Sequence, residues 1–191
     1  MSWLDLDQTD RGGKDLSAAL TDFAAREGDD TLATLYRDFL RRHPDAFLRS
    51  CHSGHFTGSA WVVSADGQRS LLTHHKKLGR WLQPGGHADG DTNLARVALR
   101  EAEEETGLSG LRVAPAIFDL DRHRIPARGV EPEHWHYDVR YVVRAGVDEN
   151  FVVSDESNAL AWREITALAS DDTVDPSLRR MAQRWVARQP V

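Results

Sequence analysis

The sequence has a single cysteine, Cys51, so it cannot form an internal disulfide and nothing in it points to an oxidising compartment. No apolar run approaches the ~18 residues of a membrane-spanning helix, and the first ten residues, MSWLDLDQTD, lack the features of a signal peptide. An excess of basic residues is also missing: the formal net charge is −6, whereas nucleic-acid binders normally carry a basic surface. We therefore expect a cytoplasmic protein that binds neither nucleic acid nor membrane.

The 191 residues, 40% of them hydrophobic, are enough for one well-buried core with an appendage. Two amphipathic helices are predicted within the first 50 residues, over 15–26 and 31–42. Their apolar stripes must be buried, so we expect residues 1–50 to be a helical extension of the same compact unit, serving as a lid or a homodimer interface. Residues 51–191 are expected to form the main domain.

After residue 50 the pattern changes to strands interleaved with two helices, which predicts an α+β sandwich. Alternating or continuous apolar segments predict strands over 55–64, 69–75, 111–120 and 134–145, and a short strand or bend over 158–165. Helices are predicted over 92–107, with Thr92 or Asp91 as N-cap and Gly107 at the end, and over 175–188. Residues 81–91 begin extended and become a loop, and 121–133 are a polar loop.

The predicted helix over 92–107 crowds four glutamates into five positions. At roughly 100° per residue, Glu101, Glu104 and Glu105 share one arc beside the apolar stripe, whereas Glu103 points to solvent. Like charges at this spacing repel by about 0.2–0.5 kcal/mol per pair. Three converging carboxylates suit a hard divalent cation such as Mg²⁺, which binds oxygen ligands and substrate phosphates. The alternative is a solvated helix end with an Arg100–Glu104 ion pair.

The sequence around these glutamates resembles the signature box of the Nudix hydrolases. The positions in register with the box are Gly86, Arg100, Glu101, Ala102, Glu104, Glu105, Gly107 and Leu108. One position departs, because Thr92, with Asp91 beside it, stands where the box has its first glutamate. The resemblance spans roughly residues 55–170 and implies the Nudix fold, a mixed β-sheet sandwiched between helices (α/β/α).

The resemblance also implies the chemistry. Nudix enzymes hydrolyse the diphosphate linkage of a small nucleoside diphosphate derivative, using Mg²⁺ or Mn²⁺ and an activated water. The implied metal ligands are the carboxylates of Glu101, Glu104 and Glu105 and the main-chain carbonyl of Gly86.

Three further roles follow from the resemblance. Arg100 is expected to orient Glu101 through a forked ion pair that a lysine cannot match. Gly85 lets the main chain approach ligand and metal without a Cβ in the way. The general base is either a glutamate of the box or a distal acid, for which Glu156 and its neighbour Asp155 are the candidates.

Histidine and basic residues are expected to bind the substrate. On the strand over 134–145, His134, His136, Asp138 and Arg140 share one face, which predicts a lined pocket. The His-x-His spacing leaves a zinc site open as an alternative. The candidate substrate-binding residues are Gly85, His87, His75, Lys77, Arg80, His123, His136, Asp138 and Arg140.

Two other functions remain open for a chain of this fold. One is a ligand-sensing domain without turnover, although such domains tend to lose box glutamates that are intact here. The other is an isopentenyl-diphosphate isomerase, which places a cysteine where this chain has Gly85 and Gly86. The sequence does not choose among nucleoside diphosphate sugars, ADP-ribose, dinucleoside polyphosphates and nucleoside triphosphates as substrate.

Overall fold

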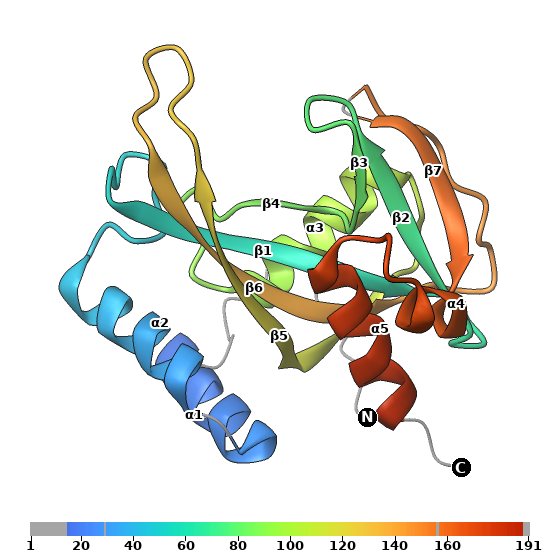
Figure 1. The fold of residues 1–191 in the computed structure, drawn as a ribbon, viewed down its shortest axis with the longest axis horizontal. Helices are drawn as coiled ribbons and strands as arrows, with labels where there is room; N and C mark the ends of the chain where they lie inside the picture. Colours follow the sequence, from blue (N-terminus) through green and yellow to red (C-terminus); the bar gives the residue numbers. More distant parts are fainter. Residues whose placement is uncertain (1–14, 29, 156, 189–191) are drawn as a thin grey trace.

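The computed structural model describes residues 15–28, 30–155 and 157–188, which form a mixed sheet with helices on both faces (Figure 1). The strands are β1 (Gly54–Val63), β2 (Arg69–His75), β3 (Arg80–Leu82), β4 (Gly85–His87), β5 (Arg112–Ile125), β6 (His134–Arg144) and β7 (Ser157–Glu164). The helices are α1 (Leu16–Glu27), α2 (Thr31–Arg42), α3 (Leu94–Thr106), α4 (Ile165–Ser170) and α5 (Pro176–Arg188). This confirms the α+β class and the α/β/α sandwich. No helix in the described ranges combines the length and hydrophobicity of a membrane span.

The sheet has the order β3-β2-β1-β6-β5, with β4 pairing with β1 and β7 pairing with β2. β1 and β6 are parallel, whereas the other pairings between these strands are antiparallel. β1 changes partner along its length: its middle residues 57–59 pair with β4, and Val63 pairs with Ser70 of β2. β2 therefore diverges from β1, and β4 crosses the region between them, in front of α3 (Figure 1).

Several elements differ from the sequence prediction, among them β4, a strand within the segment that was expected to become a loop. β5 continues to Ile125, so the expected loop over 121–133 begins later, because antiparallel pairing with β6 extends to Ile125 opposite His134. The N-cap of α3 is Asn93, whose Oδ1 accepts a hydrogen bond from the Arg96 main-chain N at 3.2 Å. The expected cap Asp91 instead forms an ion pair with Arg96 at 2.6 Å. α4 was not predicted, while Gly107 ends α3 with φ 66° as expected.

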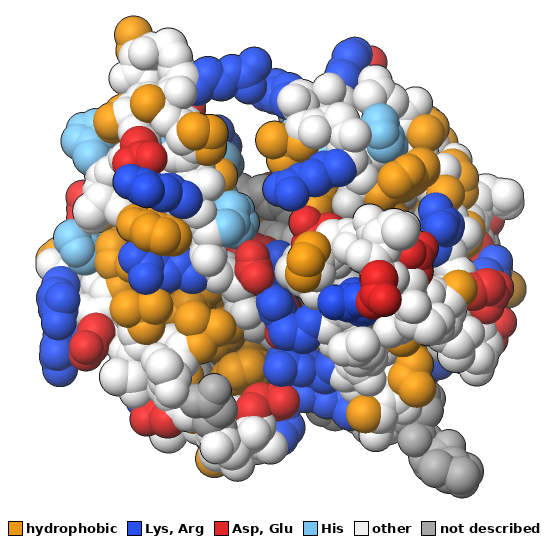
Figure 2. Space-filling model, in the orientation of Figure 1, with side chains coloured by type: hydrophobic (Ala, Val, Ile, Leu, Met, Phe, Trp, Pro, Cys, Tyr) orange, Lys and Arg blue, Asp and Glu red, His pale blue; other side chains and the backbone are white. Residues whose placement is uncertain are grey.

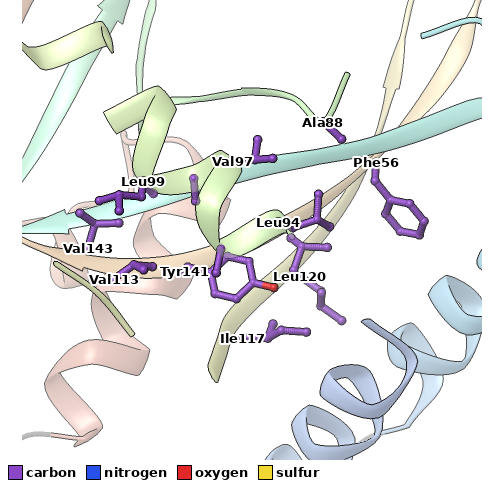
Figure 3. Close-up of a cluster of buried hydrophobic side chains, with 14 of the residues drawn as sticks. Phe56, Ala88, Leu94, Val97, Leu99, Val113, Ile117, Leu120, Tyr141 and Val143 are labelled. Carbon is purple, nitrogen blue, oxygen red and sulfur yellow. The ribbon is translucent and has the colours of Figure 1, made fainter. Parts of the chain in front are cut away.

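The core has two parts, one on each face of the sheet. On the face covered by α1, α2 and α3, Leu94, Val97 and Leu99 of α3 pack on residues of β1, β5 and β6 (Figure 3). On the other face, α4 and α5 pack over Trp61, Phe118 and Val142. Burial of this apolar surface holds α3 against the sheet.

The helical extension packs on the sheet of its own chain. The ring of Phe39 on α2 stacks on Tyr137 of β6 with centroids 3.9 Å apart, and the Tyr36 hydroxyl donates to the Asp138 carbonyl oxygen at 3.1 Å. The apolar stripes are therefore covered without a second protomer. A homodimer stays a prediction, but an exposed apolar face on these two helices no longer supports it.

Candidate functional site

The two glycines of β4 lie between β1 and the glutamates of α3. The Gly85 main-chain N donates to Oε1 of Glu105 at 2.8 Å. A Cβ at Gly86 would lie 2.4 Å from Oε2 of Glu101, and a Cβ at Gly85 would lie 2.1 Å from Oγ of Ser59. A side chain at Gly86 would displace the Glu101 carboxylate, and one at Gly85 would meet the main chain of Ser59, so glycine at these positions lets β4 approach its neighbours closely.

Arg100 links Glu101 to β4. Its Nη2 donates to Oε1 of Glu101 at 2.8 Å and to the His87 carbonyl oxygen at 3.1 Å, while its Nε lies 3.9 Å from Oε1 of Glu104. Burial, the largest single effect, disfavours the guanidinium charge, but the hydrogen bond to Glu101 and the charges of Glu101, Glu104 and Asp91 together outweigh it and raise the pKa of Arg100. The contact with Glu101 is made through Nη2, which is not the forked ion pair that the sequence predicted, and the orienting role of Arg100 stays a prediction.

The four glutamates differ in exposure. The side chain of Glu101 is 16% exposed and that of Glu104 is 64% exposed, and Glu105 is half-buried. Glu103 is exposed, as expected from the helical arc; partial burial and the charge of Glu104 raise its pKa. The carboxylate of Glu101 lies in the space that a side chain at Gly86 would fill, and that of Glu105 accepts a hydrogen bond from the Gly85 main-chain N. An all-oxygen donor set of this kind fits a hard divalent cation.

On the face of the sheet away from α3, Asp138 and Arg140 belong to a buried network of hydrogen bonds and ion pairs. Asp138 Oδ1 accepts hydrogen bonds from the hydroxyls of Thr57 and Ser59, each at 2.8 Å, and its Oδ2 accepts from Arg140 Nε at 2.7 Å. Both residues are only 2% exposed. These contacts favour a structural role, and direct contact of Asp138 or Arg140 with a substrate stays a prediction.

The same network attaches α5 to the sheet. Arg180 of α5 donates to Asp119 at 2.7 Å and to Asp121 at 3.0 Å. Burial opposes ionisation of Asp121, but a hydrogen bond from His123 and the charges of Arg140 and Arg180 hold its pKa well below the usual range. Sequence reasoning missed this network because α5 and β5 are far apart in the chain, and only their packing brings the charges together.

Histidines gather at the end of this polar face. Cross-strand pairing places His123 of β5 beside His136 of β6, and His136 beside His55 of β1, in one row. His87 of β4 lies next to this row, opposite Thr57. Burial lowers the pKa of His136 to about 2 and that of His87 to about 4, so both rings are neutral at neutral pH. His87, His123 and His136 were predicted at the site; His55 was missed, because its place depends on the β1–β6 register.

The basic residues before the Gly–Gly strand lie at the β2–β3 turn. Lys77 and Arg80 are exposed, the Lys77 main-chain N donates to Nδ1 of His75 at 3.2 Å, and Arg80 pairs with Asp175 at 3.2 Å. Figure 2 shows the molecule hollowed between the β5–β6 hairpin and the part built from β2, β3 and β7, with histidine and basic side chains beside the hollow.

The candidates for the general base are placed only in part. Asp155 is exposed beside the start of β7. Glu156 lies outside the described residues. The identity of the base therefore stays a prediction.

The strand β4, with Gly85 and Gly86, lies beside the glutamates of α3 within an α/β/α sandwich, and this is the arrangement of a Nudix domain. A family model described as "NUDIX domain" matches residues 55–185, so the chain belongs to the Nudix family. The match includes β4, α3 and the histidine row, while the helical extension precedes it.

Comparison with individual proteins gives more distant likenesses. Two strains of Mycobacterium tuberculosis have a protein named "Putative 8-oxo-dGTP diphosphatase 3" that is 33% identical over 104 residues, covering 51% of this chain and 45% of the relative. The chain thus matches about half the length of these curated relatives. The solved structure of a C. elegans Ap4A hydrolase binary complex aligns with a TM-score of 0.55 and 15% identity, over 69% of this chain and 95% of that one.

A second solved structure gives the same result. The E. coli dihydroneopterin triphosphate pyrophosphohydrolase aligns with a TM-score of 0.53 and 17% identity, over 70% of this chain and 96% of that one. At such identities the two structures show a shared fold alone.

Proposed function

We propose that this protein hydrolyses the diphosphate linkage of a small nucleoside diphosphate derivative and that it requires Mg²⁺ or Mn²⁺. The observation that carries the proposal is the close approach of Gly85 and Gly86 to the carboxylates of Glu105 and Glu101. The names of the relatives, which include a diphosphatase, an Ap4A hydrolase and a triphosphate pyrophosphohydrolase, support a phosphoanhydride as the bond that is cleaved.

Glu101, Glu104 and Glu105, with the carbonyl oxygen of Gly86, would hold the divalent cation. When bound, the cation would neutralise charge on the diphosphate and make a water molecule acidic enough to attack phosphorus. Arg100 holds the Glu101 carboxylate against β4, so this proposed metal-binding side chain is oriented before the substrate binds.

Groups around the hollow would bind the rest of the substrate. His75, Lys77 and Arg80 would attract its negative charge, and His87 lies next to the glycine strand that would meet the phosphates. Glu156 is our first candidate for the general base, with Asp155 and the box glutamates as rivals. A cytoplasmic location and a homodimer remain part of the proposal.

A panel of hydrolysis assays, in which the nucleotide products are separated and identified by chromatography, tests the function. It covers nucleoside diphosphate sugars, ADP-ribose, dinucleoside polyphosphates and nucleoside triphosphates, each with Mg²⁺ and with Mn²⁺. We expect turnover of at least one class, and a loss on the order of 10²-fold or more in kcat for Glu101→Gln, Glu104→Gln or Glu105→Gln, since each removes a preorganised charge. Glu103→Gln, on the same helix but outside the arc that the three proposed ligands share, is the matched control and should keep near wild-type activity.

Two outcomes would change the proposal. Cation binding without turnover of any compound would indicate the ligand-sensing alternative. Wild-type turnover in a Glu156→Gln variant would exclude Glu156 as the base. The isomerase alternative loses support from the structure, because a cysteine at Gly85 would place its Cβ 2.1 Å from Oγ of Ser59.

A further inference from the structure

Three imidazoles from three different strands face one another on the α5 side of the sheet. The ring centroids of His55 and His136 are 4.8 Å apart, and the ring of His87 lies 5.0 Å from each of them. One nitrogen from each ring lies within 4.8 Å of a nitrogen of the other two. Nearly equal spacing of three rings around one point is the arrangement in which imidazoles share a cation.

Sheet register, and not chance contact of flexible side chains, produces this triangle. His55 lies beside His136 in the parallel β1–β6 pairing, and His87 lies opposite Thr57 in the antiparallel β1–β4 pairing. Alternate residues of a strand share a face, so His55 and Thr57 point to the same side of β1. Their neighbours on the adjacent strands, His136 and His87, therefore lie on that side too. Rigid strands hold the three ring positions before any ligand arrives.

The His55 ring is buried without a hydrogen-bond partner. His55 is 2% exposed, and neither Nδ1 nor Nε2 makes a hydrogen bond of normal geometry to a described residue. Burial lowers the pKa of His55, and a weak interaction with the Cys51 main chain only partly opposes this. Buried polar nitrogens are nearly always paired, because leaving them unpaired costs free energy. A cation bound by one of these nitrogens would satisfy it.

A fourth histidine holds His136 in place. Nδ1 of His134 lies 2.8 Å from the Pro132 carbonyl oxygen, which can only accept, so Nδ1 carries the hydrogen and donates it. Nε2 of His134 can then accept a hydrogen bond from Nε2 of His136 at 3.3 Å, which leaves the lone pair of the His136 ring on Nδ1. Hydrogen bonds of this kind fix the tautomer and orientation of metal-binding histidines.

We propose that His55, His87 and His136 form a binding site for a divalent transition metal ion of the Zn²⁺ type, separate from the glutamates of α3. Imidazole nitrogens favour Zn²⁺ and similar ions, whereas carboxylate oxygens favour Mg²⁺. The two sets of ligands lie on opposite faces of β4: Gly86 faces Glu101, and its neighbour His87 faces the other side. With three protein side chains bound, a four-coordinate ion keeps one open position for an oxygen atom of water or of another molecule.

Access to the site is provided by two of its members. His87 and His136 are partly exposed, whereas His55 forms the buried end of the cluster. An ion could therefore enter from the surface hollow beside the histidines (Figure 2). The site does not depend on the proposed hydrolase activity, since none of its ligands belongs to the acidic helix.

Zinc binding to the metal-free full chain tests the proposal. Zn²⁺ affinity is measured by competition with a chromogenic chelator, and Co²⁺ is added separately to record the visible absorption of a site with nitrogen ligands. We expect one ion per chain, and at least a tenfold weaker affinity in each of His55→Gln, His87→Gln and His136→Gln. His52→Gln is the matched control, because His52 is exposed and close to His55 in sequence, and it should bind like wild type.

Further variants locate the bound ion. Glu101→Gln should keep full Zn²⁺ affinity, and excess Mg²⁺ should not displace the zinc. His43, Asp45 and Cys51 form another described group whose ligand atoms lie within 4.8 Å, so Cys51→Ser should also leave the affinity unchanged. Circular dichroism and thermal unfolding of the metal-free variants show whether each is folded. If His55→Gln does not fold, the test rests on His87→Gln and His136→Gln, because these two side chains are partly exposed.

The proposal is overturned if the folded histidine variants bind Zn²⁺ as tightly as wild type does. It is also overturned if binding is lost in Cys51→Ser or Glu101→Gln and retained in the histidine variants. Failure of wild type to bind Zn²⁺ or Co²⁺ would leave the triangle as a packing arrangement alone. Each of these results is independent of whether the chain hydrolyses a diphosphate.

Discussion

Gly86 on β4 and Glu101 on α3 lie so close together that a Cβ at residue 86 would meet Oε2 of Glu101 at 2.4 Å. The same carboxylate is held from its other side by Arg100 Nη2 at 2.8 Å. Its position is therefore set by a strand on one side and by its own helix on the other. Substitutions on either side should displace the carboxylate without removing it.

Replacing Gly86 with alanine should separate β4 from α3 at this point. We expect a loss on the order of 10²-fold in kcat, because a shift of about 1 Å in a reacting or ligating group has that effect. Steady-state kinetics with Mg²⁺, together with circular dichroism, measure it. Gly146→Ala is the control, since its Cβ would meet nothing closer than 3.5 Å. Unchanged kcat in Gly86→Ala would contradict the role of this contact.

Replacing Arg100 with lysine should weaken cation binding. Arg100 donates from one nitrogen to both the Glu101 carboxylate and the His87 carbonyl oxygen, and an ammonium group on a flexible stem does not reproduce this planar arrangement. We expect the Mg²⁺ concentration for half-maximal activity to rise roughly tenfold, as for other residues that orient ligands. Arg41→Lys, on the surface of α2, should leave it unchanged. An identical Mg²⁺ dependence in both variants would exclude the orienting role.

Acid should destabilise the fold partly through Asp121. Its pKa is depressed in the folded state, so the unfolded chain binds the proton more readily as the pH falls. The stabilisation is fully present above the unfolded pKa of about 3.9 and is lost as the pH falls through the folded value. Urea unfolding at several pH values should therefore show a smaller loss of stability below about pH 4 in Asp121→Asn than in wild type. Equal slopes would show that Asp121 does not titrate differently on folding.

Truncation of Phe39 tests whether the helical extension and the sheet unfold together. Phe39 is 6% exposed and stacks on Tyr137. Phe39→Ala should lower the free energy of unfolding by roughly 3–5 kcal/mol while a single transition is retained. Val130→Ala, at a fully exposed position, should change it by less than about 0.5 kcal/mol. Two separate transitions would show that residues 1–50 are an independent unit.

The local patterns of the sequence predicted most of the elements. Alternation along β6 and helical spacing along α3 are properties of neighbouring residues, so they required no knowledge of the fold. The predictions failed where pairing partners decide an element's length, as in the extension of β5 to Ile125, and where two side chains compete for a cap, as with Asn93 and Asp91. α4 is short and lies between two elements, which leaves little periodicity to detect.

The sequence by itself indicated the family, which the family match confirms, and it predicted the acidic site, because Gly86 and the glutamates of α3 lie within one continuous segment whose spacing carries the signal. Only the tertiary structure decided what surrounds that segment. His55 and His136 are far apart in the chain and meet through the parallel β1–β6 register, and Asp121 meets Arg180 through the packing of α5. Such contacts depend on strand order and register, which a single sequence does not specify because many pairings bury similar apolar surface.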